Sequence, residues 1–137
     1  MFKVKIIAVG RAKEAWLNAA LSEYEKRLKG RMELDWLLAE DNGSLSAYCR
    51  KEPILIALDI KGDLLNSEAF SDKWMRFGAR ATFVIGGPEG LPAEILKAAQ
   101  WRWSLSPLTF TNQMVRLLLI EQLYRALEIA RGSPYHK

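Results

Sequence analysis

The 137-residue sequence predicts an α/β fold with a mostly parallel sheet and helices on both of its faces. Strand-like segments alternate with segments of helical spacing along the whole chain. Two of the strand-like segments, 53–59 and 81–85, are apolar without alternation, which is typical of parallel strands covered on both faces. The length and the 50% content of hydrophobic residues fit a single domain over residues 1–137.

The elements expected before residue 80 follow from the spacing of apolar residues and from the glycines that end several runs. Alternation predicts the first two strands, and intervals of three and four residues predict the helices. The expected order is a strand over 2–9, a helix over 17–28 ending at Gly30, strands over 32–38 and 53–59, and a helix over 70–77. Residues 41–52, which contain Asn42-Gly43 and several serines, predict a loop with at most a short helix.

The second half of the chain contains the longest expected helix. The elements expected there are a strand over 81–85, a helix over 92–100, a short strand over 101–106 and a helix over 112–131. The last helix is apolar nearly all round between Met114 and Ile120, which is more than one buried stripe requires. We therefore expect it to pack on two sides, and a homodimer would supply the second side.

Three segments that follow expected strands suit a ligand site. They are 58–62, 85–90 and 104–109. Ligands of parallel α/β sheets bind beyond the carboxyl ends of the strands. Gly86, Gly87 and Gly90 suit either a tight turn or a loop whose bare backbone lies against a small molecule. Glu89, the only acid in that loop, suits either a ligand contact or the cap of the next helix.

Several function classes are excluded by what the sequence lacks. It has no dinucleotide-binding or phosphate-loop motif. Ser104 and Ser106 stand outside any nucleophile elbow, so a hydrolase triad is not expected. One cysteine, Cys49, and one histidine, His136, leave no set of ligands for a metal and no disulfide. No apolar run approaches a membrane span and no signal-peptide pattern is present, so we expect a cytoplasmic protein.

The C-terminal segment carries the basic excess. The net charge of +4 comes from residues 97–137, which hold six basic and two acidic residues. Such an excess suits an anionic partner such as RNA, and it is also common on solvated surfaces. Tyr135 and His136 suit stacking on or hydrogen bonding to a nucleobase, while Lys137 and Arg131 suit phosphate contacts. A disordered tail is the alternative.

Three strings carry a resemblance to a known family. IGGPEG, WSLSPLTFTNQMVRLLLIEQLYRA and the terminal PYHK closely resemble the ribosomal RNA large subunit methyltransferase H family of the SPOUT superfamily. The resemblance extends from VKIIAVGRAK through ALDIKG to the last residue. It implies an S-adenosylmethionine-dependent enzyme that methylates N3 of a pseudouridine in 23S rRNA. It also implies a homodimer and a C-terminal trefoil knot, one of the rare exceptions to unknotted folds.

The resemblance also implies which residues form the site. S-adenosylmethionine would lie against Leu58, Gly86, Leu105, Ser106, Pro107, Leu108, Thr109 and Phe110. Methyl transfer needs N3 lined up behind the sulfonium methyl carbon, and N3 must lose its proton. We hypothesise that Arg116, His136 and Lys137 stabilise the base as it becomes anionic, with Tyr135 orienting it.

Two departures from the family pattern bear on this reading. Asn112 stands where the family often has histidine, and an amide cannot take a proton near neutral pH. The segment 41–52 is shorter than usual. The modest basic excess favours the assembled ribosome over naked RNA as substrate, since a folded substrate supplies shape. The alternatives are a SPOUT enzyme for another RNA position and a non-enzymatic RNA-binding or ribosome-associated module, because one fold hosts many functions.

Overall fold

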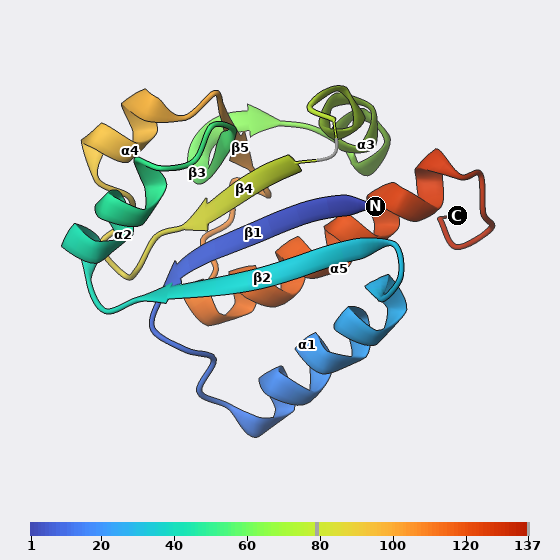
Figure 1. Ribbon diagram of the computed structural model, residues 1–137, viewed down its shortest axis with the longest axis horizontal. Helices are drawn as coiled ribbons and strands as arrows, with labels where there is room; N and C mark the ends of the chain where they lie inside the picture. The colour runs from blue at the N-terminus through green and yellow to red at the C-terminus, as the bar shows by residue number, and fades with distance from the viewer. Residues whose placement is uncertain (79, 137) are drawn as a thin grey trace.

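A computed structural model describes residues 1–78 and 80–136 (Figure 1). Within these residues one sheet of five strands has the order β2-β1-β4-β3-β5, and every pair of neighbours is parallel. The strands are β1 (Phe2–Val9), β2 (Met32–Ala39), β3 (Leu55–Leu64), β4 (Arg80–Ile85) and β5 (Trp101–Ser104). The helices are α1 (Ala15–Leu28), α2 (Asn42–Cys49), α3 (Ser67–Arg76), α4 (Ala93–Ala98) and α5 (Asn112–Ala130).

Helices cover both faces of the sheet, as predicted. The larger core lies between the sheet and helices α1, α3 and α5, and its centre is an aromatic stack in which the Phe70 and Trp103 rings lie 3.9 Å apart. A smaller core lies between the opposite face and helices α2 and α4, around Leu45, Cys49 and Ile95. Continuous apolar runs in β4 and in the first half of β3 are thus explained by burial on both sides.

Three elements end two or more residues away from their expected last residues. Strand β3 continues to Leu64 instead of ending at 59, because its pairing with β5 resumes after a register shift between Leu58 and Asp63. The polar residues of this extension face solvent, so apolar patterning could not reveal it. Helix α4 ends at Ala98, and β5 ends at Ser104 rather than 106. The segment 41–52 does contain a short helix, α2, whose first turn is capped by Asp41.

The C-terminal tail and the carboxyl ends of three strands lie on opposite sides of the molecule in Figure 1. The carboxyl ends of β1, β2 and β4 lie together, at the left in Figure 1. The C-terminal tail lies at the right, beyond the end of α5 (Figure 1). The strand order does not test the trefoil knot, which stays a prediction. Over the described residues, none of the helices combines the length and apolar character that crossing a membrane requires.

Candidate functional site

A large cleft lies at the carboxyl edge of the sheet. Its volume is about 1010 Å³, and three segments of the chain form its walls together with the first turn of α5. The segments are 58–61 of β3, 85–91 after β4 and 105–111 after β5. The prediction that these strand ends meet is confirmed, although the first segment lies within β3 rather than after it.

Most residues expected to bind the cofactor line this cleft. They are Leu58, Gly86, Leu105, Ser106, Leu108, Thr109 and Phe110. Pro107 is not among the lining residues. Leu108 and Phe110 are 69% and 38% exposed, so the apolar rim on this side of the cleft is largely uncovered in the single chain.

The glycine loop after β4 is a tight turn that also forms a wall of the cleft. Gly90 N donates to Gly87 O over 3.0 Å, and Gly90 has a φ of +79°, which glycine adopts without strain. A Cβ added to Gly86 would lie 2.8 Å from the carbonyl carbon of Gly90, so the turn itself requires glycine there. The capping role expected for Glu89 is wrong, because the N-cap residue of α4 is Pro92 and no side chain among the described residues caps this helix.

Two serines shape the segment after β5. Ser104 Oγ donates to the carbonyl oxygen of Ser106 over 3.0 Å, and Leu108 N donates to Ser106 Oγ over the same distance. These bonds fold residues 104–108 into a fixed bend at the mouth of the cleft. Both hydroxyl groups thus make local structural hydrogen bonds, which agrees with the expectation that the two serines are ordinary loop residues and not nucleophiles.

Tyr135 and His136 are held by charged residues of α5 and α3. Tyr135 Oη donates to Glu121 Oε2 over 2.8 Å, and Arg125 Nη2 donates to the same oxygen over 3.0 Å. Arg125 Nη1 lies 3.0 Å from His136 Nδ1, and the other ring nitrogen of His136 is hydrogen-bonded to Glu68. The tail is therefore ordered, which contradicts the alternative of a disordered tail over its described residues.

The contact with Glu121 fixes the protonation state of Tyr135. Burial raises the pKa of the Tyr135 hydroxyl, and the hydrogen bond to the Glu121 carboxylate raises it further. Tyr135 thus remains a neutral donor at physiological pH and is unsuited to accept a proton. Glu121, Arg125 and Glu68 were not among the residues predicted for the site. The available signal was the Glu121–Arg125 pair at i,i+4 spacing inside an otherwise apolar stretch of helix.

Within one chain the tail and the cleft stay apart. Asn112 and Val115 line the cleft from the first turn of α5. Glu121 and Arg125, which hold the tail, lie roughly 9 and 15 Å further along the helix axis than Val115, at 1.5 Å per residue. None of the described residues 131–136 lines the cleft. Lys137 was also expected at the site, but it lies outside the described residues.

Arg116 lies in the core rather than in the cleft. The residue is 1% exposed, and its Nη2 donates to the Val9 carbonyl oxygen over 2.8 Å. Its Nε has no hydrogen-bond partner among the described residues. Burial lowers the pKa of the guanidinium, which nevertheless stays charged because the ordinary value is so high. Arg116 therefore contacts the end of β1 in the structure.

Comparison with known proteins fixes the family. The sequence model of the family described as "Predicted SPOUT methyltransferase" matches residues 2–136. The chain belongs to the SPOUT methyltransferase family. A relative from Protochlamydia amoebophila is 50% identical over the full length of both chains, and one from Synechococcus sp. (strain CC9605) is 43% identical over 98% of this chain and 96% of its own. Both are named ribosomal RNA large subunit methyltransferase H.

Solved structures support the fold of this SPOUT methyltransferase. A probable methylase family protein from Haemophilus influenzae superimposes with a TM-score of 0.65 over 98% of this chain and 70% of its own, at 11% identity. A protein from Legionella pneumophila, solved with bound SAM, gives 0.50 over 94% of this chain and 66% of its own, at 12% identity. At such identities the likeness shows the fold alone.

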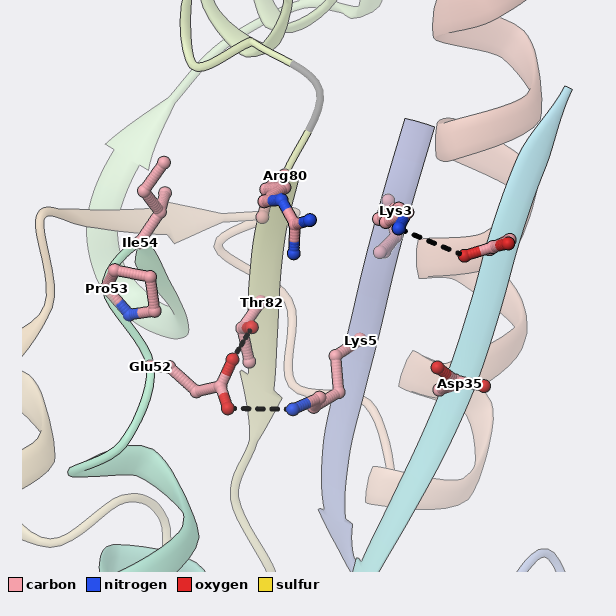
Figure 2. A pocket seen from close by; sticks show the side chains of 11 residues that line it. Lys3, Lys5, Asp35, Glu52, Pro53, Ile54, Arg80 and Thr82 are labelled. Carbon is pink, nitrogen blue, oxygen red and sulfur yellow. Dashed lines mark hydrogen bonds and ion pairs between the residues drawn. The ribbon is translucent and has the colours of Figure 1, made fainter. Parts of the chain in front are cut away.

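A second hollow of this SPOUT methyltransferase is polar and lies on the sheet face near the amino ends of the strands (Figure 2). Its volume is about 320 Å³. Glu52 accepts from Lys5 Nζ over 2.8 Å and from Thr82 Oγ1 over 2.6 Å, as Figure 2 shows. Partial burial raises the pKa of Glu52, but these hydrogen bonds outweigh it and the pKa is lowered. The hollow's charges largely satisfy one another. Over residues 1–78 and 80–136, no cluster of side chains suits a metal ion.

A buried carboxylate anchors the tail of the SPOUT methyltransferase to the rest of the fold. Glu128 is 1% exposed and accepts from Arg31 Nη1 over 3.0 Å and from Arg131 Nε over 2.6 Å. Burial raises the pKa of Glu128, but hydrogen bonds from Ser133, Arg131, Tyr124 and Arg31 outweigh it and lower the pKa to about 2. The turn that leads to Tyr135 is therefore tied to the α1–β2 connection.

We expect Glu128→Gln to lower the free energy of unfolding at neutral pH. The pKa difference corresponds to about 3 kcal/mol, and screening around the exposed Arg131 reduces it to roughly 1–2 kcal/mol. Because the folded pKa lies below the unfolded one, this stability is fully present above pH 4.5 and is lost as the pH falls toward about 2. Urea unfolding of wild type and variant at pH 7 and pH 3 measures the stability that the Glu128 carboxylate contributes at each pH. An equal difference between wild type and variant at both pH values would contradict the assignment.

Proposed function

We propose that this SPOUT methyltransferase transfers a methyl group from S-adenosylmethionine to N3 of a pseudouridine in 23S rRNA of the assembled ribosome. The observation that carries the proposal is the cleft at the carboxyl edge, in a chain 50% identical over its full length to a protein named ribosomal RNA large subunit methyltransferase H. The substrate also implies cytoplasmic localisation.

The residues of the cleft fit S-adenosylmethionine. A ligand of this size takes a pocket of roughly 300–1,000 Å³ with apolar walls and a few polar groups, and the cleft has about 1010 Å³. Leu58, Leu105 and Leu108 supply apolar surface for the adenine, and Gly86 leaves backbone accessible at a strand end. Thr109 and Phe110 extend the wall, while Pro107 acts by shaping the segment. When bound, the cofactor supplies an electrophilic methyl group on a sulfonium.

We infer that the active site is completed across a homodimer. One chain holds Tyr135 and His136 away from its own cleft, and methyl transfer requires reacting atoms about 3–3.5 Å apart. Met114, Leu117 and Leu118 of α5 are only partly buried in the single chain, which agrees with the expected second packing surface. A partner packed there would cover this apolar surface and bring its tail toward the cleft.

Each tail residue has a distinct role in this proposal. Tyr135, locked as a donor to Glu121, presents its ring and orients the target base. Arg125 and Glu68 occupy both ring nitrogens of His136 in the single chain, so in this proposal one of these contacts opens and the freed nitrogen exchanges a proton with N3. Lys137 and Arg125 offset the charge that develops on the base. Arg116 acts indirectly: it hydrogen-bonds to the end of β1 from the core and so supports the wall of the cleft. Asn112 lines the cleft but cannot take a proton.

The deciding experiment is transfer of labelled methyl from S-adenosylmethionine to ribosomes that lack this modification. Isolated rRNA and ribosomes that lack the pseudouridine serve as controls. Label at one base of the large-subunit RNA, absent from the uridine control, is the expected result. Cofactor binding without transfer to any of these substrates would indicate another RNA position. Absence of cofactor binding would indicate a non-enzymatic ribosome-binding module.

A further inference from the structure

The loop between β1 and α1 is exposed and yet firmly held. Gln113 Oε1 accepts from Lys13 N over 3.1 Å, and Gln113 Nε2 donates to Arg11 O over 3.3 Å. Asn18 Nδ2 donates to the carbonyl oxygens of Ala12 and Glu14. At the start of the loop Arg116 binds the Val9 carbonyl oxygen. Side chains from two helices thus fix the backbone of this short connection, whereas exposed loops are ordinarily mobile.

The same bonds place the loop beside the cleft. Gln113 follows Asn112, which lines the cleft, and its Nε2 lies 3.4 Å from Asn112 Oδ1. Any shift of the loop would therefore be transmitted to the first turn of α5. A group bound on the loop lies at a defined position relative to the cleft.

The side chains that this loop presents are suited to a nucleic acid. Arg11 and Lys13 are exposed, and neither takes part in an ion pair within residues 1–78 and 80–136. Glu14 adds one exposed negative charge, so residues 10–16 keep a net charge of +1. Trp16, the second residue of α1, is 55% exposed. Two exposed cations that lie five and three residues before an exposed aromatic side chain match phosphates and an unstacked base.

We propose that Arg11, Lys13 and Trp16 form a docking surface for ribosomal RNA that flanks the target base, an inference that rests on the proposed function. Arg11 and Lys13 contact phosphates, and the Trp16 ring stacks on an unpaired base. The clamps from Gln113, Asn18 and Arg116 hold the surface in place before the RNA arrives, so little ordering is needed on binding. The polar hollow of Figure 2 lacks this character, because its two lysines are paired with Glu33 and Glu52 and no aromatic side chain is among its described lining residues.

The test is methyl transfer to ribosomes lacking the modification, measured for wild type and for the double variant Arg11→Glu/Lys13→Glu. We expect KM for the ribosome to rise on the order of tenfold. The slope of log KM against log salt concentration is expected to fall by about two, because two phosphate contacts are lost. kcat and the affinity for S-adenosylmethionine are expected to stay unchanged. The matched control is Lys51→Glu/Arg80→Glu, which reverses one exposed lysine and one exposed arginine near the amino ends of the strands. A KM equal to that of the control would overturn the proposal.

The aromatic part of the surface has its own variants. Trp16→Ala is expected to raise KM roughly tenfold, and Trp16→Phe to restore most of the affinity because the stacking face remains. Sedimentation of both variants separates RNA docking from subunit packing. If Trp16→Ala converts a dimer into monomers, the ring belongs to the subunit interface and its assignment to RNA is overturned. If wild type itself methylates no ribosomal RNA, the proposed function fails; normal transfer with an unaffected double variant refutes the docking surface alone.

Discussion

Removal of the His136 imidazole is expected to lower kcat for methyl transfer by about a hundredfold or more, the usual contribution of a positioned acid–base group. His136→Ala leaves the cleft residues intact, so the affinity for S-adenosylmethionine should not change. Tyr135→Phe removes only the hydroxyl that binds Glu121. It should lower kcat less than His136→Ala, because the ring remains to orient the base. Single-turnover transfer to ribosomes lacking the modification, together with calorimetry of cofactor binding, measures both effects.

The structural role of these residues has a separate control. Ser133→Ala alters the same turn without touching the groups assigned to chemistry, since Ser133 Oγ accepts from Tyr135 N over 3.2 Å. If Ser133→Ala lowers kcat as much as His136→Ala, the loss reflects a displaced tail rather than lost chemistry. Normal turnover of both Tyr135→Phe and His136→Ala with saturating ribosomes would remove the tail from the mechanism.

Mixed dimers provide a direct test of the site across two subunits. Equal amounts of His136→Ala and of a cofactor-cleft variant, Thr109→Trp, each inactive alone, should recover about a quarter of wild-type activity after subunits exchange, because half of the dimers carry one intact site. Recovery is not possible if each chain completes its own site. Activity that stays at the level of the separate variants, with exchange verified, would therefore refute the composite site.

Gly62→Ala is expected to be the most destabilising single substitution considered. A Cβ at this position would lie 2.5 Å from Arg102 O and 2.8 Å from Trp103 N, both backbone atoms of β5. The two strands must separate to admit it, and overpacking of this kind costs about 3 kcal/mol. Because residues 105–110 follow β5 directly, affinity for S-adenosylmethionine should fall as well. Urea unfolding and calorimetry of cofactor binding measure the two effects.

The matched control for this substitution is Gly43→Ala. Gly43 lies in α2, and the nearest atom to its added Cβ is Asp41 Oδ1 at 3.4 Å. Alanine favours helix over glycine by up to about 1 kcal/mol, so this variant should be neutral or slightly stabilised. Similar unfolding midpoints for the two alanine variants would show that β3 and β5 tolerate the added methyl group.

The sheet and cleft could be predicted because each depends on local patterning. The glycines after β4 and Ser106 after β5 follow strands whose parallel order brings their ends together, and Gly86 and Ser106 do line one cleft. The extension of β3 was missed because Asp59 and Lys61 give it no apolar pattern, and only pairing with β5 reveals it.

The surroundings of the tail could not be read from local patterning. Glu68 lies 68 positions before His136, and only the packing of α3 on α5 brings them together. Arg116 was hypothesised from the family resemblance to stabilise the target base, whereas the structure buries it and bonds it to the Val9 carbonyl oxygen at the end of β1. The spacing of apolar residues in a sequence shows which face of a helix is buried. It does not show which other element of the fold packs on that face.

The strand order has a consequence for how the chain is made. The central strand β4 pairs with β1, so the middle of the sheet closes only after residue 85 has been synthesised. At about 5–20 residues per second, the apolar edge of β1 waits on the order of 4–15 s for its partner. Until then the nascent chain exposes a strand edge open to aggregation. Biosynthesis of this small protein should therefore benefit from chaperones that shield its first 80 residues.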